Sequence, residues 1–241
     1  MPRGRQVQYA CVDRVTAVPT GPGEAVIEAA DPRSTLFFRS VAHRAKLVAA
    51  NASQVAVVVA ADPSFNDELV ARVLAAAECA GMRSLIVLNK SDLEPETIQA
   101  LARLEPFARA GYPPLVVSAL RDAGGAIEDL REQLRGDTTV LVGQSGMGKS
   151  TLINALFPEA NAATREISTF LASGKHTTTH ARLYRLEGGL DAGSAVIDCP
   201  GLQDFGLAHL DWRQLAAGFR EFRPFIDRCR FPDCRHQSEP G

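Results

Sequence analysis

The 241-residue sequence contains no apolar run long enough to cross a membrane. A transmembrane helix needs about 20 apolar residues, whereas the longest apolar run, VAVVVAA at residues 55–61, has only the length of a strand. The start of the chain, MPRGRQVQYA, has basic residues but no apolar stretch behind them, which does not fit a secretory signal. We therefore expect no association with a membrane.

Cysteine is scarce: five residues are scattered over the chain, and such an odd, scattered set does not form a disulfide framework. We therefore expect a protein of the reducing cytoplasm. A formal net charge of −2 also excludes a chain that is basic throughout. The segment from Arg213 to Arg235 nevertheless holds six arginines and three acidic residues. Such a run is usually a solvated face, and the alternative is a surface that contacts nucleic-acid phosphates.

Three regions differ in their residue pattern. Residues 1–44 contain three short β-like runs between Pro and Gly turns, and residues 211–241 form a tail that begins with one helical segment. Residues 50–208 alternate between strands and helices, which predicts a mostly parallel sheet with helices on both faces. The expected strands are 55–61, 84–88, 115–118, 138–143, 181–186 and 194–198, and the expected helices are 66–81, 95–109, 126–135 and one that begins at residue 149.

A phosphate-binding loop is predicted at GQSGMGKS, which fits G-x-x-x-x-G-K-[ST] between an expected strand and an expected helix. Backbone N–H groups of such a loop surround a phosphate at the positive end of the following helix. The lysine bridges the β- and γ-phosphates, and the serine hydroxyl binds Mg²⁺. The residues concerned are Gly143, Gln144, Ser145, Gly146, Met147, Gly148, Lys149, Ser150 and Thr151.

The segment SAVIDCPG supplies a second element of a nucleotide site. An apolar strand ends at Asp198, whose carboxylate can hold Mg²⁺, and the N–H of Gly201 can reach the γ-phosphate. Between this segment and the loop lies a threonine-rich stretch, in which one threonine must bind Mg²⁺ when the γ-phosphate is present. The candidates are residues 177–179, of which we favour Thr178 for binding Mg²⁺ and for catalysis.

A guanine-recognition turn is predicted at Asn89-Lys90-Ser91-Asp92, directly after an apolar strand. The Asp92 carboxylate can accept hydrogen bonds from the guanine ring N–H and amine, Asn89 can contact the purine edge, and the Lys90 stem can lie along the ring. A site of this kind rejects adenine, because its polar groups would stay unpaired. The segment VSAL fits the second half, in which Ser118 precedes Ala119 and the N–H of Ala119 donates to guanine O6.

These elements occur in the order base turn, Ser-Ala loop, phosphate loop, threonine segment and Asp-x-Pro-Gly, which is a circular permutation of the usual GTPase order. Permutation is tolerated because the termini of a domain often lie close together. One consequence is mechanical. The turn after Asp198 leads almost directly to the C-terminal segment, so loss of the γ-phosphate can pull on that segment.

With its motifs GQSGMGKSTLIN, GKHTTTHARLY, DCPGLQDFGL and CRFPDCRH, the chain closely resembles the ribosome small-subunit-dependent GTPase A family from about residue 11 to the end. The resemblance implies an α/β fold: a circularly permuted P-loop GTPase domain at 50–208, after a partial OB-type β-barrel at 1–44 and before a zinc-binding helical tail at 211–241. It also implies that the chain binds GTP or GDP with Mg²⁺ and acts in late maturation of the small ribosomal subunit. Contact with that subunit and its rRNA would stimulate hydrolysis. We expect a monomer.

The resemblance implies one zinc ion bound by Cys229, Cys234 and His236 with a further cysteine, but the chain ends at Gly241, where this fourth ligand should follow. A structural zinc site needs four ligands. The alternative is two unlinked cysteines and a surface histidine. The β region also lacks the first strands of the barrel, so we expect a chain trimmed at both ends.

Many GTPases orient the attacking water with a glutamine after Asp-x-x-Gly, but Leu202 occupies that position here. His176 is the candidate that the resemblance supports for this catalytic role, with surface polarity as the alternative, and Lys149 completes the catalytic set with Thr178. The missing glutamine predicts slow intrinsic hydrolysis and dependence on a partner. Two other functions stay open: a GTP-gated rRNA-binding module with negligible hydrolysis, and a permuted GTPase that acts on the large subunit.

Overall fold

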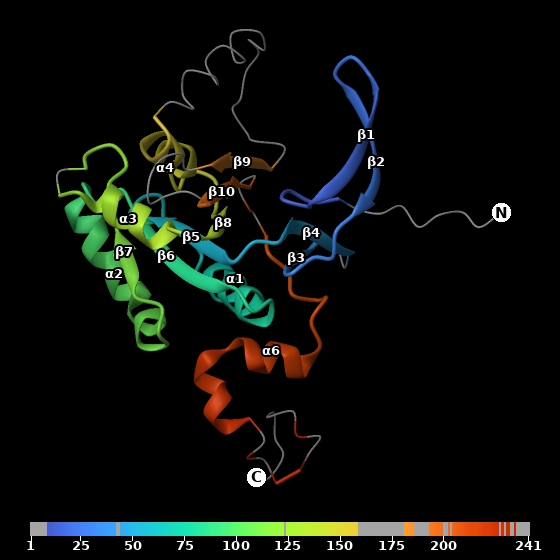
Figure 1. Cartoon of the computed structure of the whole chain (residues 1–241). Helices are drawn as coiled ribbons and strands as arrows, with labels where there is room; N and C mark the ends of the chain where they lie inside the picture. Colours follow the sequence, from blue (N-terminus) through green and yellow to red (C-terminus); the bar gives the residue numbers. More distant parts are fainter. Residues whose placement is uncertain are drawn as a thin grey trace.

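A computed structural model describes residues 9–41, 44–122, 124–158, 181–185 and 193–199, and after these residues 202, 204–226, 228, 230–231 and 234. Within these residues no helix is both long and apolar enough to span a membrane. Figure 1 shows a central sheet surrounded by helices, a β-hairpin that projects from it, and a C-terminal helical segment beneath it.

The central sheet has six strands in the order β7-β6-β5-β8-β10-β9 (Figure 1). All neighbouring pairs are parallel except β10 and β9, so the edge strand β9 is antiparallel. This arrangement confirms the predicted mostly parallel sheet. The strands are β5 (Gln54–Ala60), β6 (Arg83–Asn89), β7 (Pro114–Val116), β8 (Thr138–Val142), β9 (Arg182–Arg185) and β10 (Ala195–Asp198).

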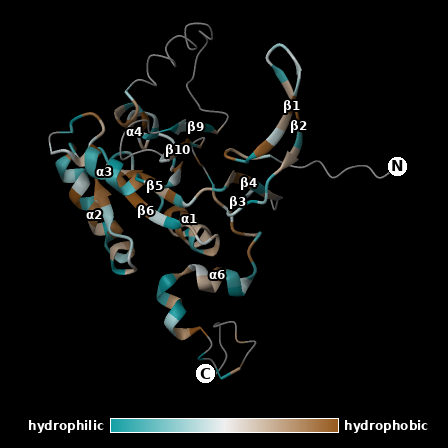
Figure 2. Cartoon of the chain, in the orientation of Figure 1, coloured by the Kyte–Doolittle hydropathy of each residue, from teal (hydrophilic) through white to brown (hydrophobic). Residues whose placement is uncertain are grey.

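Helices connect the parallel strands as predicted. They are α1 (Asp67–Cys79), α2 (Glu94–Arg109), α3 (Ala126–Leu134) and α4 (Lys149–Leu156). Because strand–helix–strand crossovers are right-handed, this strand order places α1 and α2 on one face of the sheet and α3 and α4 on the other. All seven residues of β5 are buried, and Figure 2 shows the most hydrophobic ribbon along the central strands. Burial on both faces explains why β5 is a continuous apolar run.

The N-terminal strands form two separate antiparallel pairs among the described residues. β1 (Val15–Gly21) pairs with β2 (Glu24–Ala30) in the projecting hairpin of Figure 1, and β3 (Leu36–Val41) pairs with β4 (Arg44–Ala50). The sequence analysis expected three strands ending by residue 44 and missed β4. RAKLVAA begins with polar residues and ends in two alanines, so its strand signal is weak, and pairing with β3 determines its conformation.

The C-terminal segment packs against α1. Helix α6 (Trp212–Gly218) begins with a capping box at Asp211, and a 3₁₀ helix (Arg220–Phe225) follows it. Gly218 lies so close to α1 that a Cβ atom there would be 2.8 Å from the carbonyl oxygen of Ala75. The absence of a side chain at residue 218 therefore permits the close contact between the two helices.

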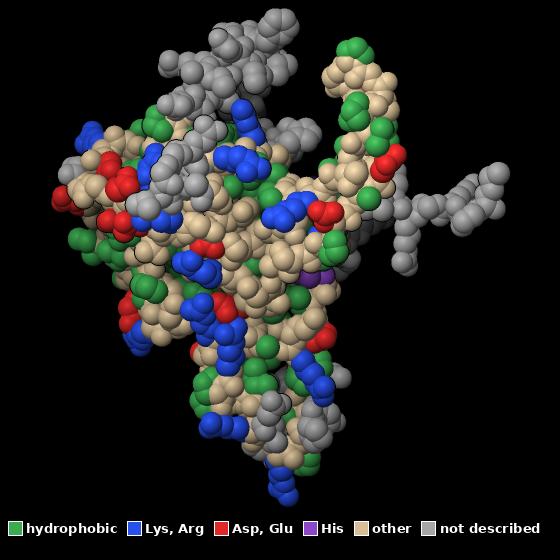
Figure 3. All heavy atoms as spheres, viewed as in Figure 1, with side chains coloured by type: hydrophobic (Ala, Val, Ile, Leu, Met, Phe, Trp, Pro, Cys, Tyr) green, Lys and Arg blue, Asp and Glu red, His purple; other side chains and the backbone are tan. Residues whose placement is uncertain are grey.

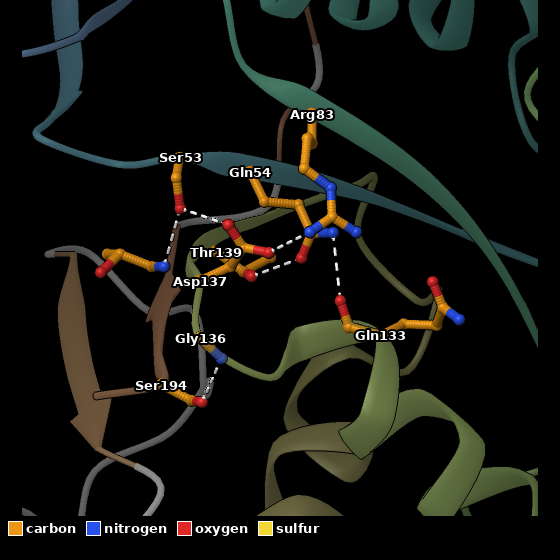
Figure 4. Close-up of polar contacts among 9 residues, drawn as sticks. Ser53, Gln54, Arg83, Gln133, Gly136, Asp137, Thr139 and Ser194 are labelled. Carbon is orange, nitrogen blue, oxygen red and sulfur yellow. Dashed lines mark hydrogen bonds and ion pairs between the residues drawn. The ribbon is translucent and has the colours of Figure 1, made fainter. Parts of the chain in front are cut away.

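A polar network surrounds the junction where α3 passes into β8, which is the point that permutation creates (Figure 4). The Asp137 carboxylate accepts from the Ser53 hydroxyl at 2.7 Å and pairs with Arg83 at 2.5 Å. The Thr139 hydroxyl donates to the Gln54 side chain at 2.7 Å. These contacts lie at the amino ends of the parallel strands and fix β8 against β5.

Candidate nucleotide-binding site

The predicted site residues lie at one edge of the sheet. The base turn follows β6, the Ser-Ala loop follows β7, the phosphate loop follows β8, and Asp198 ends β10. All four strands are parallel, so these segments meet at the carboxyl ends of the strands, where ligands of α/β sheets bind. The structure therefore brings together segments that are separated by more than one hundred residues of sequence.

Asn89 connects three of these segments. Its side chain is buried, with 1% exposure, and it donates to the Met147 carbonyl oxygen at 3.0 Å. Its Oδ1 accepts from the Ala119 backbone N–H at 3.1 Å. A buried amide must have such partners, so Asn89 holds the base turn against both the Ser-Ala loop and the phosphate loop. The Ala119 N–H, expected at guanine O6, donates to the Asn89 side chain in this structure, and its contact with the base stays a prediction.

Asp92 and Ser118 form the second contact of the base site. The Ser118 hydroxyl donates to the Asp92 carboxylate at 2.6 Å and accepts from the Arg121 N–H at 3.1 Å. The bond from Ser118 lowers the pKa of Asp92 below its usual value. The carboxylate is therefore ionised at neutral pH and can accept hydrogen bonds from a ligand that offers two adjacent N–H groups.

Lys149 begins α4 and points back into the phosphate loop. Its ammonium group donates to the carbonyl oxygens of Gly143 at 2.7 Å and Gln144 at 3.0 Å. Burial lowers the pKa of Lys149, and the nearby Asp198 carboxylate opposes this shift. An ammonium group enclosed in this way has little contact with solvent and acts strongly on an anion that enters the loop.

Close approach of other segments requires glycine at two positions of the phosphate loop. A Cβ atom at Gly143 would lie 2.3 Å from the Val58 carbonyl oxygen, and one at Gly148 would lie 2.3 Å from the Asn89 side-chain nitrogen. Gly148 also has a positive φ of +83°. The loop therefore packs directly against β5 and against the base turn, which a larger residue at either position would prevent.

The described oxygen donors fit a magnesium ion. Asp198 is 5% exposed, and burial raises the pKa of its carboxyl group while the Lys149 charge lowers it. Ser150 is exposed in the first turn of α4. Carboxylate and hydroxyl oxygens are the ligands that Mg²⁺ prefers. After Asp198, the chain returns to the phosphate loop, because the Leu202 N–H donates to the Gly143 carbonyl oxygen at 3.0 Å.

Residues 62–66 contact both the phosphate loop and the base turn, and the sequence did not predict this role. The Gln144 side chain accepts from the Asn66 N–H at 2.8 Å, and the Lys90 ammonium donates to the Asp62 carbonyl oxygen at 2.6 Å. Pro63 lies against Gly146. The sequence contains a signal only for Asn66, whose side chain accepts from Leu69 N–H and caps α1 as predicted.

Several predicted residues lie outside the described part of the chain. They are His176, Thr178 and the neighbouring threonines, Gly201, Cys229 and His236. Of the expected zinc ligands, Cys234 is described and buried. Among the described residues there is no group of three or more His, Cys, Asp or Glu side chains that could hold a metal ion.

Comparison with known proteins identifies the family. The model of a family described as RsgA GTPase matches residues 30–208. This chain belongs to the RsgA GTPase family. The match covers the complete GTPase sheet together with β3 and β4, so the chain is a GTPase by family.

A relative that carries the family name supports this conclusion, and two solved structures share the fold. The small ribosomal subunit biogenesis GTPase RsgA of Nitrosospira multiformis is 49% identical over 239 residues, which cover 99% of this chain and 74% of the relative. The structure of YjeQ from Thermotoga maritima matches with a TM-score of 0.69 and 29% identity, covering 98% of this chain and 76% of that protein. YloQ, a circularly permuted GTPase, matches with a TM-score of 0.65 and 24% identity, covering 99% of this chain and 73% of YloQ. The likeness to YloQ shows that the permuted fold is shared.

Proposed function

We propose that this chain binds GTP with Mg²⁺, hydrolyses it to GDP and phosphate, and acts in biogenesis of the small ribosomal subunit, which stimulates the hydrolysis. The observation that carries the proposal is the contact of Asn89 with both the Ser-Ala loop and the phosphate loop, because it joins a base site to a phosphate site. The name of the Nitrosospira relative, a small ribosomal subunit biogenesis GTPase, supports the ribosomal role.

In this proposal, Asp92 selects guanine. Its ionised carboxylate accepts from the ring N–H and the exocyclic amine, which adenine does not offer at these positions. The Ser118 hydroxyl holds the carboxylate in place through its 2.6 Å bond. The Lys90 stem lies along the base while its ammonium group stays on the Asp62 carbonyl oxygen. The base would thus be oriented by groups that are already fixed in position.

Phosphate binding would use the loop from Gly143 to Thr151. Lys149 exchanges one of its carbonyl partners for a phosphate oxygen, and the loop N–H groups donate to the phosphates. Ser150, Thr178 and Asp198 would hold Mg²⁺. When bound, this ion neutralises charge on the phosphate oxygens. Gly201 would donate its N–H to the γ-phosphate.

The attacking water requires a residue other than residue 202, because Leu202 is apolar and 2% exposed. We assign the positioning of this water to His176, which the family resemblance supports.

The absence of a glutamine at residue 202 also favours a second candidate function, a GTP-gated rRNA-binding module that barely hydrolyses GTP. The two functions differ in single-turnover rate and not in affinity.

The ribosome-facing surface would include the C-terminal segment. On the face shown in Figure 3, Lys and Arg side chains gather over α1 and this segment. Trp212, Phe222, Phe225 and Phe231 are exposed there, and the Arg213 guanidinium lies 5.1 Å from the Trp212 ring centroid. Exposed aromatic rings next to arginines suit stacking on unpaired bases and contact with phosphates.

The parts at both ends would complete this surface. Cys229, Cys234 and His236 would bind one zinc ion, supported by their spacing and by the burial of Cys234. Strands β1 to β4 would belong to an OB-type domain. The proposed function is carried out on ribosomal subunits, so we place the chain in the cytoplasm. We also propose that the chain acts as a monomer.

Single-turnover hydrolysis of GTP and ATP tests the proposed activity. We expect cleavage of GTP and not ATP, no cleavage by Lys149→Ala, and slow cleavage with retained GTP affinity in His176→Ala. Lys46→Ala, in β4 and outside all the loops described above, is the matched control and should cleave GTP at the parental rate. Undiminished turnover in Lys149→Ala would place the active site elsewhere. Tight, guanine-specific binding with no cleavage would favour the binding module.

A further inference from the structure

The chain that leaves the candidate site contacts the N-terminal strands before it reaches the C-terminal segment. The Ser40 N–H of β3 donates to the Gly206 carbonyl oxygen at 2.7 Å, and the Gly206 N–H donates back to the Ser40 carbonyl oxygen at 3.1 Å. These two bonds form an antiparallel bridge between β3 and the segment after Asp198. The sequence predicted an almost direct connection from Asp198 to the C-terminal segment. In the structure this connection is first hydrogen-bonded to β3.

Side chains reinforce this bridge on both sides of Gly206. Phe205 and Phe37 are each 1% exposed, and their ring centroids are 5.6 Å apart. The Ser40 hydroxyl lies 3.0 Å from His209 Nδ1. Two buried aromatic rings in contact resist separation, because each loses its packing when the other moves. The segment and β3 therefore form one packed unit.

The other end of the same segment is attached to the phosphate loop. Leu202 is 2% exposed and its N–H donates to Gly143, the first residue of the loop. Gly206 is the fourth residue after Leu202, and four extended residues span at most about 14 Å. A displacement of Leu202 that exceeds the slack of this short connection therefore either breaks the bridge at Gly206 or moves β3.

We propose that the β3–β4 hairpin is the nucleotide-responsive part of this protein, and that it responds through the bridge between Ser40 and Gly206. The inference rests on the proposed function, because the segment changes position only if a nucleotide binds between the phosphate loop and Asp198. GTP and GDP differ at the γ-phosphate, next to the segment. The two nucleotides therefore favour different positions of Leu202, and the bridge carries the difference to β3.

The close approach at Gly206 offers a specific way to break the bridge. A Cβ atom at residue 206 would lie 2.8 Å from the Ser40 carbonyl oxygen and 3.2 Å from the Ser40 Cβ atom. Gly206→Ala therefore forces the two strands apart without altering any residue assigned to the nucleotide. Gly124→Ala is the matched control, because a Cβ atom at Gly124 meets nothing within 4 Å.

Hydrogen–deuterium exchange of the 241-residue chain, with Mg²⁺ and either GDP or a non-hydrolysable GTP analogue, tests the proposal. In the parent and in Gly124→Ala, we expect the exchange rates of β3 amides to differ between the two nucleotides by about threefold or more. In Gly206→Ala the difference should disappear, while the affinity for GDP stays within about threefold of the parent.

Three results would overturn the proposal. One is a β3 that exchanges equally with both nucleotides in the parent while the phosphate loop is protected, which leaves the proposed function standing. The second is an unchanged nucleotide effect in Gly206→Ala. The third is a chain that binds neither nucleotide, which removes the proposed function as well.

If Gly206→Ala does not fold, Phe205→Leu replaces it, since it removes the ring contact with Phe37 and keeps an apolar side chain. Phe205→Leu should at least halve the difference in β3 exchange rate between the two nucleotides, and an unchanged difference contradicts the proposal.

Discussion

Asn89 shows how much of the candidate site depends on single side chains. Its amide group is buried and uses both of its ends, one on the Met147 carbonyl oxygen and one on the Ala119 N–H. An aspartate at the same position could not donate to Met147, and an alanine would leave the Met147 carbonyl oxygen and the Ala119 N–H without this partner. The base turn and the phosphate loop are therefore positioned by one residue that itself belongs to the base turn.

The first prediction concerns the choice of base. Asp92→Asn replaces an ionised acceptor by a group that also donates, so guanine loses charge-assisted bonds worth about 1.5–3 kcal/mol each. Affinity for GTP, measured by calorimetry, should fall at least about tenfold. Affinity for a xanthine nucleotide, which presents an oxygen at that position, should rise. Equal GTP affinity in the variant and the parent would remove Asp92 from the base site.

Residue types at fixed spacing were enough to predict where the described residues of the candidate site lie in the fold. The sequence correctly indicated that the base turn, Ser118, the phosphate loop and Asp198 follow strands, because each of these motifs needs a strand before it. The bonds from the Asn66 N–H to Gln144 and from Lys90 to Asp62 could not be predicted. They depend on how β5 and its following segment lie beside β6 and β8, which no local pattern encodes.

At the scale of elements, α1 connects the candidate site to the C-terminal segment. Its N-cap residue Asn66 contacts Gln144 of the phosphate loop. At its other end, Glu78 has a side chain that is 8% exposed and pairs with Arg220 at 2.7 Å and Arg223 at 2.6 Å. Arg220 also lies over the Tyr112 ring, 4.1 Å from its centroid. The last turn of α1 is therefore the anchor of the C-terminal segment.

The second prediction tests this anchor. Glu78→Gln removes the charge that two arginines share, and the resulting loss of charged hydrogen bonds should release residues 220–226. Tryptic cleavage within residues 213–230 should become about tenfold faster, which corresponds to 1.4 kcal/mol. Glu105→Gln, on the exposed side of α2 and paired with Arg109, should be cleaved at the parental rate. Equal cleavage of Glu78→Gln and the parent would contradict the anchor.

The anchor should also depend on pH. Burial alone would raise the pKa of Glu78, but hydrogen bonds from Arg220 and Arg223 outweigh it and hold the pKa below the ordinary value of 4.5. Tyr112 also faces this carboxylate. A group with a depressed pKa stabilises the fold above its unfolded-state pKa, and this contribution is lost as the pH falls through the folded-state value. The anchor should therefore weaken only as the pH falls below about 4.5. Tryptic sensitivity of the parent, measured relative to an unfolded substrate because trypsin itself is less active at pH 6, should not change between pH 8 and 6, since both values lie well above that window.

The third prediction concerns the permuted junction of Figure 4. Asp137→Ala leaves the Ser53 hydroxyl and the Arg83 guanidinium without their shared acceptor, so the free energy of unfolding should fall by about 1–3 kcal/mol. Urea denaturation measures this loss. Asp129→Ala, exposed on α3, is the control and should change stability by less than about 0.5 kcal/mol. GTP affinity should be unchanged, because the junction lies at the opposite edge of the sheet from the candidate site. Unchanged stability of Asp137→Ala would show that the junction does not depend on this network.

Strand–helix alternation was sufficient to predict every element from β5 to β10 that the structure describes. The alternation works because each strand of a parallel sheet is buried on both faces and each helix has one apolar side. The N-terminal region was predicted less well. Its first two strands are largely exposed, and all seven residues of β2 are exposed, so they lack the apolar run of a buried strand. β4 takes its conformation from pairing with β3, and its own residues carry only a weak strand signal, so the sequence pattern missed it.

For the whole molecule, the structure places both appended regions in contact with the GTPase domain. β3 contacts the segment after Asp198, and the C-terminal segment contacts α1. A ribosomal subunit bound to either region could therefore act on the nucleotide site through residues already in contact. Such an arrangement suits the proposed dependence of hydrolysis on the subunit, in a chain that lacks the water-orienting glutamine.

The most direct test of the account is single-turnover hydrolysis of GTP by this chain, alone, with small ribosomal subunits and with large ribosomal subunits. We predict slow hydrolysis by the chain alone, a rate at least about tenfold higher with small subunits, as expected for a partner that stabilises the transition state, and no acceleration with large subunits. Equal rates with and without small subunits, or equal acceleration by both subunits, would contradict the proposal that this is a GTPase of small-subunit biogenesis.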